Sequence, residues 1–98
     1  MRRLHVYRLV DGQLAPDVQS DYVDTGSRIV VPLVPVGDGS PVLPRLHPSV
    51  TVEGERYRLR TEALGAVEKP RIRPGALADI SDQHDAVRDA LDFLFLGF

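Results

Sequence analysis

The sequence predicts a small, mainly β domain that ends in one α-helix. As far as Gly75, short apolar stretches alternate with polar residues and are separated by Gly, Pro and Asp, which is typical of strands joined by turns. After Asp79 the apolar residues recur at helical spacing instead. About five strands followed by one helix favour a small β barrel or sheet with the helix packed on it.

Two strands and a polar bend are predicted at the beginning of the chain. Residues 4–10 nearly alternate between apolar and polar and stop at the Asp11-Gly12 pair, which favours a turn. Residues 14–20 are the second predicted strand, where Pro16 must lie at a sheet edge or at the strand's beginning. Residues 21–28 are rich in Asp, Thr and Gly, so we expect a polar bend there.

The middle of the chain holds the most apolar stretch and the clearest hairpin. Residues 28–36 predict one strand buried on both faces, and Pro32 and Pro35 indicate an edge or a bulge nearby. In residues 49–60, apolar residues alternate up to a Glu53-Gly54 turn and alternate again after it. This pattern predicts a β-hairpin.

One or two short strands and then a helix are predicted for the last part of the chain. Residues 65–77 hold the short strands, which Pro and Gly interrupt. Asp79 or Ser81 is the expected N-cap of the helix. The apolar residues that follow are spaced for one face of an amphipathic helix. They are Val87, Ala90, Leu91, Leu94, Phe95 and Phe98.

The composition limits the classes of protein to consider. With 98 residues the chain is expected to be a single domain, residues 1–98. It has no cysteine, which excludes disulfides and a thiolate nucleophile. A net charge of −2 argues against nucleic acid as the main partner, because phosphate binding needs clustered Lys and Arg. No apolar run approaches a membrane span or a signal peptide, so we expect a cytoplasmic protein without a membrane partner.

No catalytic constellation is visible in the sequence. The three histidines have no partner at metal-ligand spacing, so we expect no metal and no cofactor. The carboxylates of residues 17–24 are interpreted as turn and cap groups, the alternative being an acid–base pair. The GDGS stretch at residues 37–40 is too short for a phosphate loop. Alternating arginines at residues 56–60 share one strand face, which is either solvated or contacts an anionic partner.

The sequence ends on DFLFLGF, residues 92–98, although chain ends are usually polar. Leu96 and Phe93 lie off the apolar face of the helix, and two such residues beside a free end make an apolar patch. Gly97 can adopt the left-handed conformation that closes a helix, which leaves Phe98 free to turn. The alternative is that Phe98 packs inward against the end of the helix.

Three stretches of the chain resemble the CcdB family of plasmid and chromosomal toxins. They are DVQSDYVDTGSRIVVPL at residues 17–33, LHPSVTVEGERYRL at residues 46–59 and LADISDQHDAVRDALDFLFLGF at residues 77–98. The first string is specific, and the terminal Gly followed by one apolar residue is informative through its position. The resemblance runs nearly end to end and is weak around residues 68–76.

The resemblance implies a mainly β fold, an SH3-like barrel of the CcdB/MazF type with a C-terminal α-helix. It implies a homodimer with its two helices near the twofold axis. It further implies the toxin of a type II toxin–antitoxin system that binds the A subunit of DNA gyrase and traps the gyrase–cleaved DNA complex. Such a toxin is not an enzyme. A CcdA-like antitoxin would neutralise it by folding a disordered segment onto it.

The family's gyrase-binding positions fall on residues near both ends of this chain. Those at the tip are Leu96, Gly97 and Phe98, and those that flank it are Tyr22, Val23, Asp92 and Phe95. The best-known plasmid member carries tryptophan at Leu96 and asparagine at Asp92, so a cation–π contact is lost here and a charge is added. For Tyr22 the alternative is a ring that lies over the dimer seam.

Two other functions stay open on the same fold. One is a MazF-type endoribonuclease, which would need an anion-binding groove and acid–base residues on the loops. The other is a domesticated, non-toxic relative that keeps the fold and the dimer.

Overall fold

The computed structural model describes all of residues 1–98 and contains short strands, three 3-10 turns and one α-helix. The strands are β1 (His5–Arg8), β2 (Leu14–Pro16), β3 (Ser27–Val30), β4 (Leu33–Pro35), β5 (Ser49–Val52), β6 (Glu55–Leu59), β7 (Gly65–Glu68) and β8 (Ala78–Asp79). The 3-10 turns are η1 (Thr61–Ala63), η2 (Lys69–Arg71) and η3 (Ser81–Gln83), and the helix is α1 (His84–Leu96). No helix combines the length and the apolar character that crossing a membrane requires.

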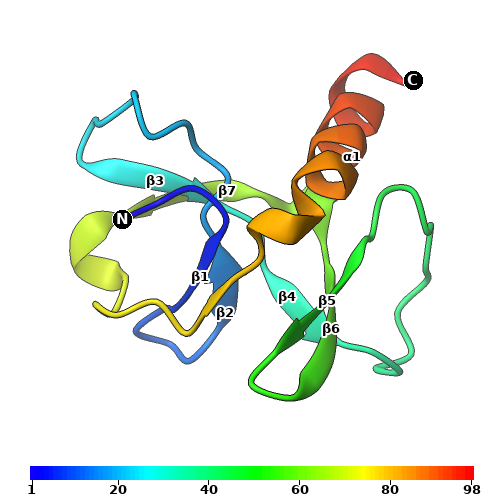
Figure 1. Ribbon diagram of the computed structural model, residues 1–98, viewed down its shortest axis with the longest axis horizontal. Helices are drawn as coiled ribbons and strands as arrows, with labels where there is room; N and C mark the ends of the chain where they lie inside the picture. Colours follow the sequence, from blue (N-terminus) through cyan, green and yellow to red (C-terminus); the bar gives the residue numbers. More distant parts are fainter.

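The strands form three small antiparallel sheets, with the orders β2-β1-β8, β3-β7 and β4-β6-β5. An isolated bridge between Asp17 and Val30 links the first two sheets, and the Arg60 N–H donates to the Pro32 carbonyl at 2.9 Å beyond the end of β6. The sheets curl around one core, and α1 rises from one side with its C-terminal end directed away from the strands (Figure 1). The result is a small barrel with a projecting helix.

The core of the barrel is aliphatic. Its buried residues are Leu4, Val6, Leu14, Val18, Val31, Leu33, Val50, Val52, Leu59, Ile80 and Val87. Val87 comes from α1 and Leu91 packs against the cluster, so the first half of the helix is fixed to the barrel by apolar packing. Each such side chain contributes about 1.5–3 kcal/mol relative to an exposed position.

The predicted hairpin is confirmed. Strands β5 and β6 pair antiparallel with Val50 opposite Tyr57 and Val52 opposite Glu55. Glu53 and Gly54 form the two-residue turn, and both have positive φ, at 50° and 82°. Two positive φ values are the signature of the turn that matches the right-handed twist of paired strands.

The prediction of one continuous strand over residues 28–36 is wrong. The stretch contains two strands, β3 and β4, which pair with different partners in different sheets. Pro32 lies between them and has no N–H for a ladder, and the preceding Val31 N–H donates to the Pro16 carbonyl at 3.1 Å. The chain therefore changes sheets at the proline, and burial in β3 alternates instead of being continuous.

The other strand predictions hold in part. Strand β2 is shorter than the predicted residues 14–20, and it lies at a sheet edge with Pro16 as its last residue, as its proline requires. Residues 65–77 supply β7, as expected. Strand β8 was not predicted, because two residues are too few to show a period.

The helix is confirmed, but its beginning differs from the prediction. The turn η3 precedes α1, and Gln83 occupies the N-cap without a side-chain cap bond. Asp79 instead accepts a 2.8 Å hydrogen bond from the Ser81 N–H and so starts the 3-10 turn. Along α1, Val87 and Ala90 are buried. The apolar face leaves the core after Leu94, which is half-buried.

Candidate functional site

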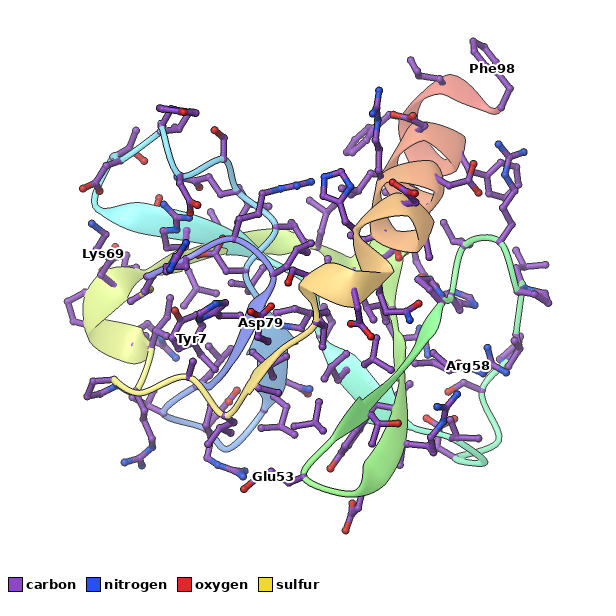
Figure 2. The ribbon with its side chains drawn as sticks, viewed as in Figure 1. Tyr7, Glu53, Arg58, Lys69, Asp79 and Phe98 are labelled. Atoms are coloured by element: carbon purple, nitrogen blue, oxygen red, sulfur yellow. The ribbon has the colours of Figure 1, made fainter.

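The C-terminal end of α1 presents large apolar side chains to solvent. Phe95 is 68% exposed, Leu96 58% and Phe98 74%. Figure 2 shows Phe98 at the far end of the helix, away from the barrel. The alternative in which Phe98 packs inward is therefore not seen in the single chain. We call residues Phe95–Phe98 the apolar tip.

Gly97 sets the direction of the apolar tip. It has φ 79° and ψ 10°, the left-handed conformation predicted from the sequence, and its N–H donates to the Phe93 carbonyl at 3.1 Å. A Cβ at this position would meet nothing within 4 Å, so the requirement for glycine lies in the backbone conformation and not in space. The reversal separates Phe98 from the helix axis.

An arginine from the loop between β4 and β5 braces the helix just before the apolar tip. Arg45 donates from Nε and Nη2 to Asp89, at 3.0 and 3.1 Å, and its guanidinium lies 4.7 Å from the centre of the Phe93 ring. The Arg45 hydrogen bond lowers the pKa of Asp89. The hydrogen bond to Asp89 raises the pKa of Arg45, and the charge of half-buried Asp92 adds to this shift.

Tyr22 and Val23 lie on the bend between β2 and β3. Tyr22 is fully exposed and Val23 is about half exposed. Arg28 links the bend to the end of β2. Its Nη1 donates to the Val23 carbonyl at 3.1 Å, and its Nε donates to Asp17 at 2.6 Å. Both members of this ion pair are buried, and the hydrogen bond to Asp17 raises the pKa of Arg28. Tyr22 is therefore an exposed ring on a fixed support.

One chain does not bring the two halves of the predicted site together. In Figure 1 the bend lies at the upper left of the molecule and the end of α1 at the upper right, with the barrel between and below them. A single surface that includes both needs a second copy of the chain or a partner long enough to reach each of them.

The interpretation of the early carboxylates as turn and cap groups is confirmed. Asp17 accepts from the Gln19 N–H at 2.9 Å and Asp24 from the Gly26 N–H at 3.5 Å, each two residues on, as in a turn, and Asp21 accepts from the Arg3 N–H at 2.8 Å. Arg28 forms ion pairs with both Asp17 and Asp21, at 2.6 and 3.7 Å, and Lys69 pairs with Asp24, so the partners of these carboxylates are cations and not one another.

Sequence reasoning missed Arg45 and Arg28. Arg45 lies 44 residues from Asp89, and no local periodicity connects such positions. The only local sign for Arg28 was its place at the edge of an apolar stretch, where a charge needs a partner once it is buried.

Comparisons with known proteins agree with the barrel and C-terminal helix described above. The fold is similar to the Mycobacterium tuberculosis toxin MazF-mt6, with a TM-score of 0.73, 12% identity and 96% of each chain covered. It is also similar to an endoribonuclease in complex with its cognate antitoxin from a mycobacterial species, with a TM-score of 0.74, 15% identity, and 100% of this chain and 96% of that chain covered. At these identities the likeness shows the fold alone, and it confirms the predicted barrel of the MazF type with a C-terminal helix.

The sequence comparisons separate the families that share this fold. A search of curated proteins gave no significant match. The family model described as CcdB protein matches residues 3–97. Since this match covers nearly the whole sequence, the chain belongs to the CcdB protein family.

Proposed function

We propose that this CcdB-family chain, the toxin of a toxin–antitoxin pair, binds the A subunit of DNA gyrase and traps gyrase on cleaved DNA. The observation that carries the proposal is the apolar tip, whose large apolar side chains are exposed at the positions for which the resemblance to the family implies gyrase anchoring. In this mechanism the chain is not an enzyme. It acts by binding a conformation of gyrase that has already cut its DNA.

The anchor is Phe98 together with Leu96, and Gly97 sets the angle between them. Burying each of these two side chains in a partner contributes about 1.5–3 kcal/mol, which is the scale of an interface hot spot. Leu96 has no π face for a gyrase arginine, so more of the affinity rests on the Phe98 ring. Half-buried Asp92 would lie at the rim of this contact.

A homodimer completes the proposed surface. Two copies related by a twofold axis present two apolar tips and two exposed bends with Tyr22 and Val23. A partner that is itself twofold, such as the gyrase A dimer, can then engage both tips at once. The second engagement is intramolecular, so the avidity exceeds the affinity of either tip.

The proposed second partner is a CcdA-like antitoxin. We propose that this chain, gyrase and the antitoxin all act in the cytoplasm. The structural neighbour that is an endoribonuclease forms a complex with its cognate antitoxin, which supports an antitoxin as a partner of this fold. An endoribonuclease activity remains the competing proposal because the neighbours share the fold. The family match favours gyrase.

The test is a gyrase supercoiling and DNA-cleavage assay on the purified chain. It compares the full chain with a variant that lacks residues 96–98 and with Phe98→Ala. Val10→Ala is the matched control, because Val10 is an exposed apolar residue on the β1 side of the barrel. Thermal melting of every variant checks that the barrel is folded.

We expect the full chain and Val10→Ala to stabilise cleaved DNA to the same extent, and the truncated chain to have no effect. Phe98→Ala should weaken inhibition by about tenfold or more, the equivalent of one buried aromatic side chain. If none of the folded proteins inhibits gyrase, the gyrase proposal fails. Cleavage of RNA by the same preparation would then assign the endoribonuclease, and inactivity in both assays would assign a non-toxic relative.

A further inference from the structure

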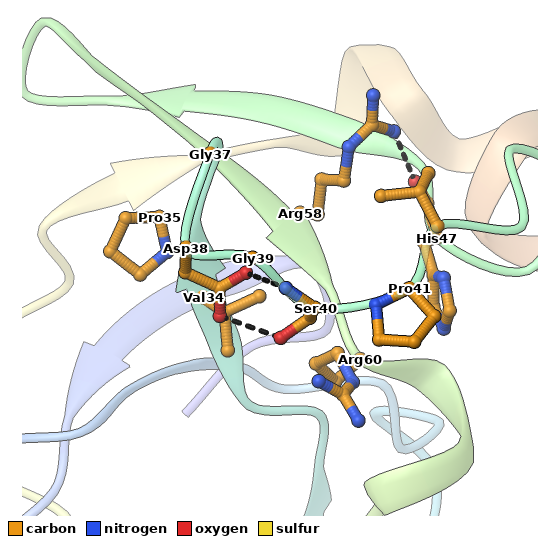
Figure 3. Close-up of a pocket in the computed structure, with 11 residues that line it drawn as sticks. Val34, Pro35, Gly37, Asp38, Gly39, Ser40, Pro41, His47, Arg58 and Arg60 are labelled. Atoms are coloured by element: carbon orange, nitrogen blue, oxygen red, sulfur yellow. Dashed lines mark hydrogen bonds between the residues drawn. The ribbon is translucent and has the colours of Figure 1, made fainter.

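A cavity of about 280 Å³ lies between strand β6 and the loop that joins β4 to β5. Arg58, Arg60 and His47 line it together with the loop residues Gly37–Pro41 (Figure 3). Apolar walls come from Val34, Pro35 and Val42. None of these residues belongs to the apolar tip or to the exposed bend.

The two arginines reach the cavity because they alternate along the end of β6. Leu59 between them is fully buried, so the residues on either side of it point the other way. Arg58 donates from Nη1 to the His47 carbonyl at 2.9 Å. The buried Nε of Arg60 donates no hydrogen bond, although it lies 3.3 Å from Glu62. Since a guanidinium has five N–H donors, both side chains keep donors free for a ligand.

The loop between β4 and β5 also brings one carboxylate, that of Asp38, to the cavity, and this carboxylate already accepts hydrogen bonds within the loop. Asp38 accepts hydrogen bonds from the Ser40 N–H and Oγ, both at 2.8 Å. These two bonds, with a contribution from the charge of Arg60, lower the pKa of Asp38. The residues that line the cavity carry two positive charges and one negative charge, and Glu62, just outside the lining, offsets the charge of Arg60. This balance suits a single carboxylate better than a phosphate dianion.

His47 forms a wall of the cavity without a free ring nitrogen. Its Nδ1 accepts from the Leu43 N–H at 3.0 Å, which places the ring hydrogen on Nε2, and Nε2 donates to Glu62 at 2.8 Å. The ring is held in one tautomer and is not available as a general base. This arrangement is suited to binding and not to catalysis.

We propose that the cavity binds the side-chain carboxylate of an acidic segment in a partner polypeptide. Arg58 and Arg60 receive the carboxylate, since the guanidinium fork matches its two oxygens. The methylene stem of the acidic residue lies against Val34, Pro35 and Val42. The proposal is independent of gyrase binding.

The test is a titration of the isotope-labelled chain, followed by amide NMR, with a blocked oligoglutamate peptide. An oligoglutamine peptide of the same length is the matched ligand, and inorganic phosphate is the third probe. The variants are Arg58→Gln and Arg60→Gln. Arg56→Gln is the matched control, because Arg56 lies on the same strand but donates to Ser49 and Thr51 outside the cavity.

We expect oligoglutamate to shift the amides of Gly37, Gly39 and Arg58, and oligoglutamine to leave them in place. Arg58→Gln or Arg60→Gln should raise the dissociation constant by about tenfold or more, the scale of a lost charge-assisted hydrogen bond. Arg56→Gln should leave it unchanged.

Three results would overturn the proposal. The first is the absence of a shift at the cavity with oligoglutamate. The second is an equal loss of binding in Arg56→Gln, which would make the attraction a general property of the basic strand. The third is tighter binding of inorganic phosphate than of oligoglutamate, which would assign the cavity to a phosphate-bearing ligand.

Discussion

Arg28 is the buried cation on which the bend with Tyr22 and Val23 rests. Its side chain is 4% exposed and that of Asp17 is fully buried, with Nε and Oδ2 2.6 Å apart. Removing one partner of a buried pair leaves an uncompensated charge, which costs about 3–5 kcal/mol. We therefore expect Arg28→Ala to lower the free energy of unfolding by that amount in urea denaturation.

A double variant controls for the loss of packing. Arg28→Ala combined with Asp17→Ala buries no unpaired charge, so its loss of stability should be smaller than the sum of the two single losses. Purely additive losses would mean that the pair stabilises the chain only through side-chain volume.

Asp79 gives the stability a defined dependence on pH. Hydrogen bonds from the Ser81 side chain and N–H lower the pKa of Asp79 below its usual 3.8, and the charge of His5 adds to this. A lowered pKa in the folded state stabilises the fold above pH 3.8, and this contribution is lost as the pH falls through the folded-state pKa. We expect Asp79→Asn, which can still accept from the Ser81 N–H, to remove only this pH-dependent part.

Urea unfolding of the two proteins at a series of pH values measures the effect. The difference in free energy of unfolding should be full well above pH 3.8. It should shrink as the pH falls below about 4 and vanish below the lowered folded-state pKa of Asp79, where this carboxyl is protonated in both states. A difference that stays constant over this range would show that the Asp79 charge contributes nothing to stability.

At the scale of the element, α1 is fixed to the barrel at its beginning and braced near its end by Arg45. We expect Arg45→Ala to accelerate amide hydrogen exchange in residues 93–97, because Phe93 loses its cation and Asp89 its two donors. The exchange rate in Arg45→Lys should lie between those of the unchanged chain and of Arg45→Ala, because lysine keeps the positive charge but lacks the planar guanidinium. Arg88→Ala, an exposed position on the same helix, is the control. Unchanged exchange in Arg45→Ala would show that the end of the helix is held by other contacts.

The elements that could be predicted from the sequence are those with a local cause. The Glu53-Gly54 hairpin and the left-handed Gly97 depend on neighbouring residues only, and both predictions are confirmed. The single strand over residues 28–36 was wrong because an apolar run shows burial but does not show where the chain changes sheets. The Arg45–Asp89 pair joins positions far apart in the sequence, so only the folded chain shows it. The proposed role of the apolar tip rests on the family and not on any periodicity.

At the scale of the whole molecule, the apolar tip lies outside the barrel of a small chain of 10.8 kDa. A domain of this size gains from burying further surface. We expect a homodimer with twice the chain mass in analytical ultracentrifugation. Its interface should include the half-buried Leu91 and Leu94 on α1, because they lie between the core residues and the tip. Leu94→Glu should therefore shift the protein toward the monomer, and Leu43→Glu, at an exposed leucine outside α1, should not.

The variant that lacks residues 96–98 distinguishes a target contact from a dimer contact. If Leu96 and Phe98 are the gyrase anchor, they stay exposed in the dimer, and the truncated chain sediments as a dimer with unchanged melting temperature. If they form the seam between two copies, the truncated chain becomes a monomer and loses gyrase inhibition only as a consequence. Leu94→Glu completes the comparison, since a monomer that still carries the apolar tip can engage gyrase once but without avidity. Strong inhibition by that monomer would contradict the role proposed here for the twofold pair of tips.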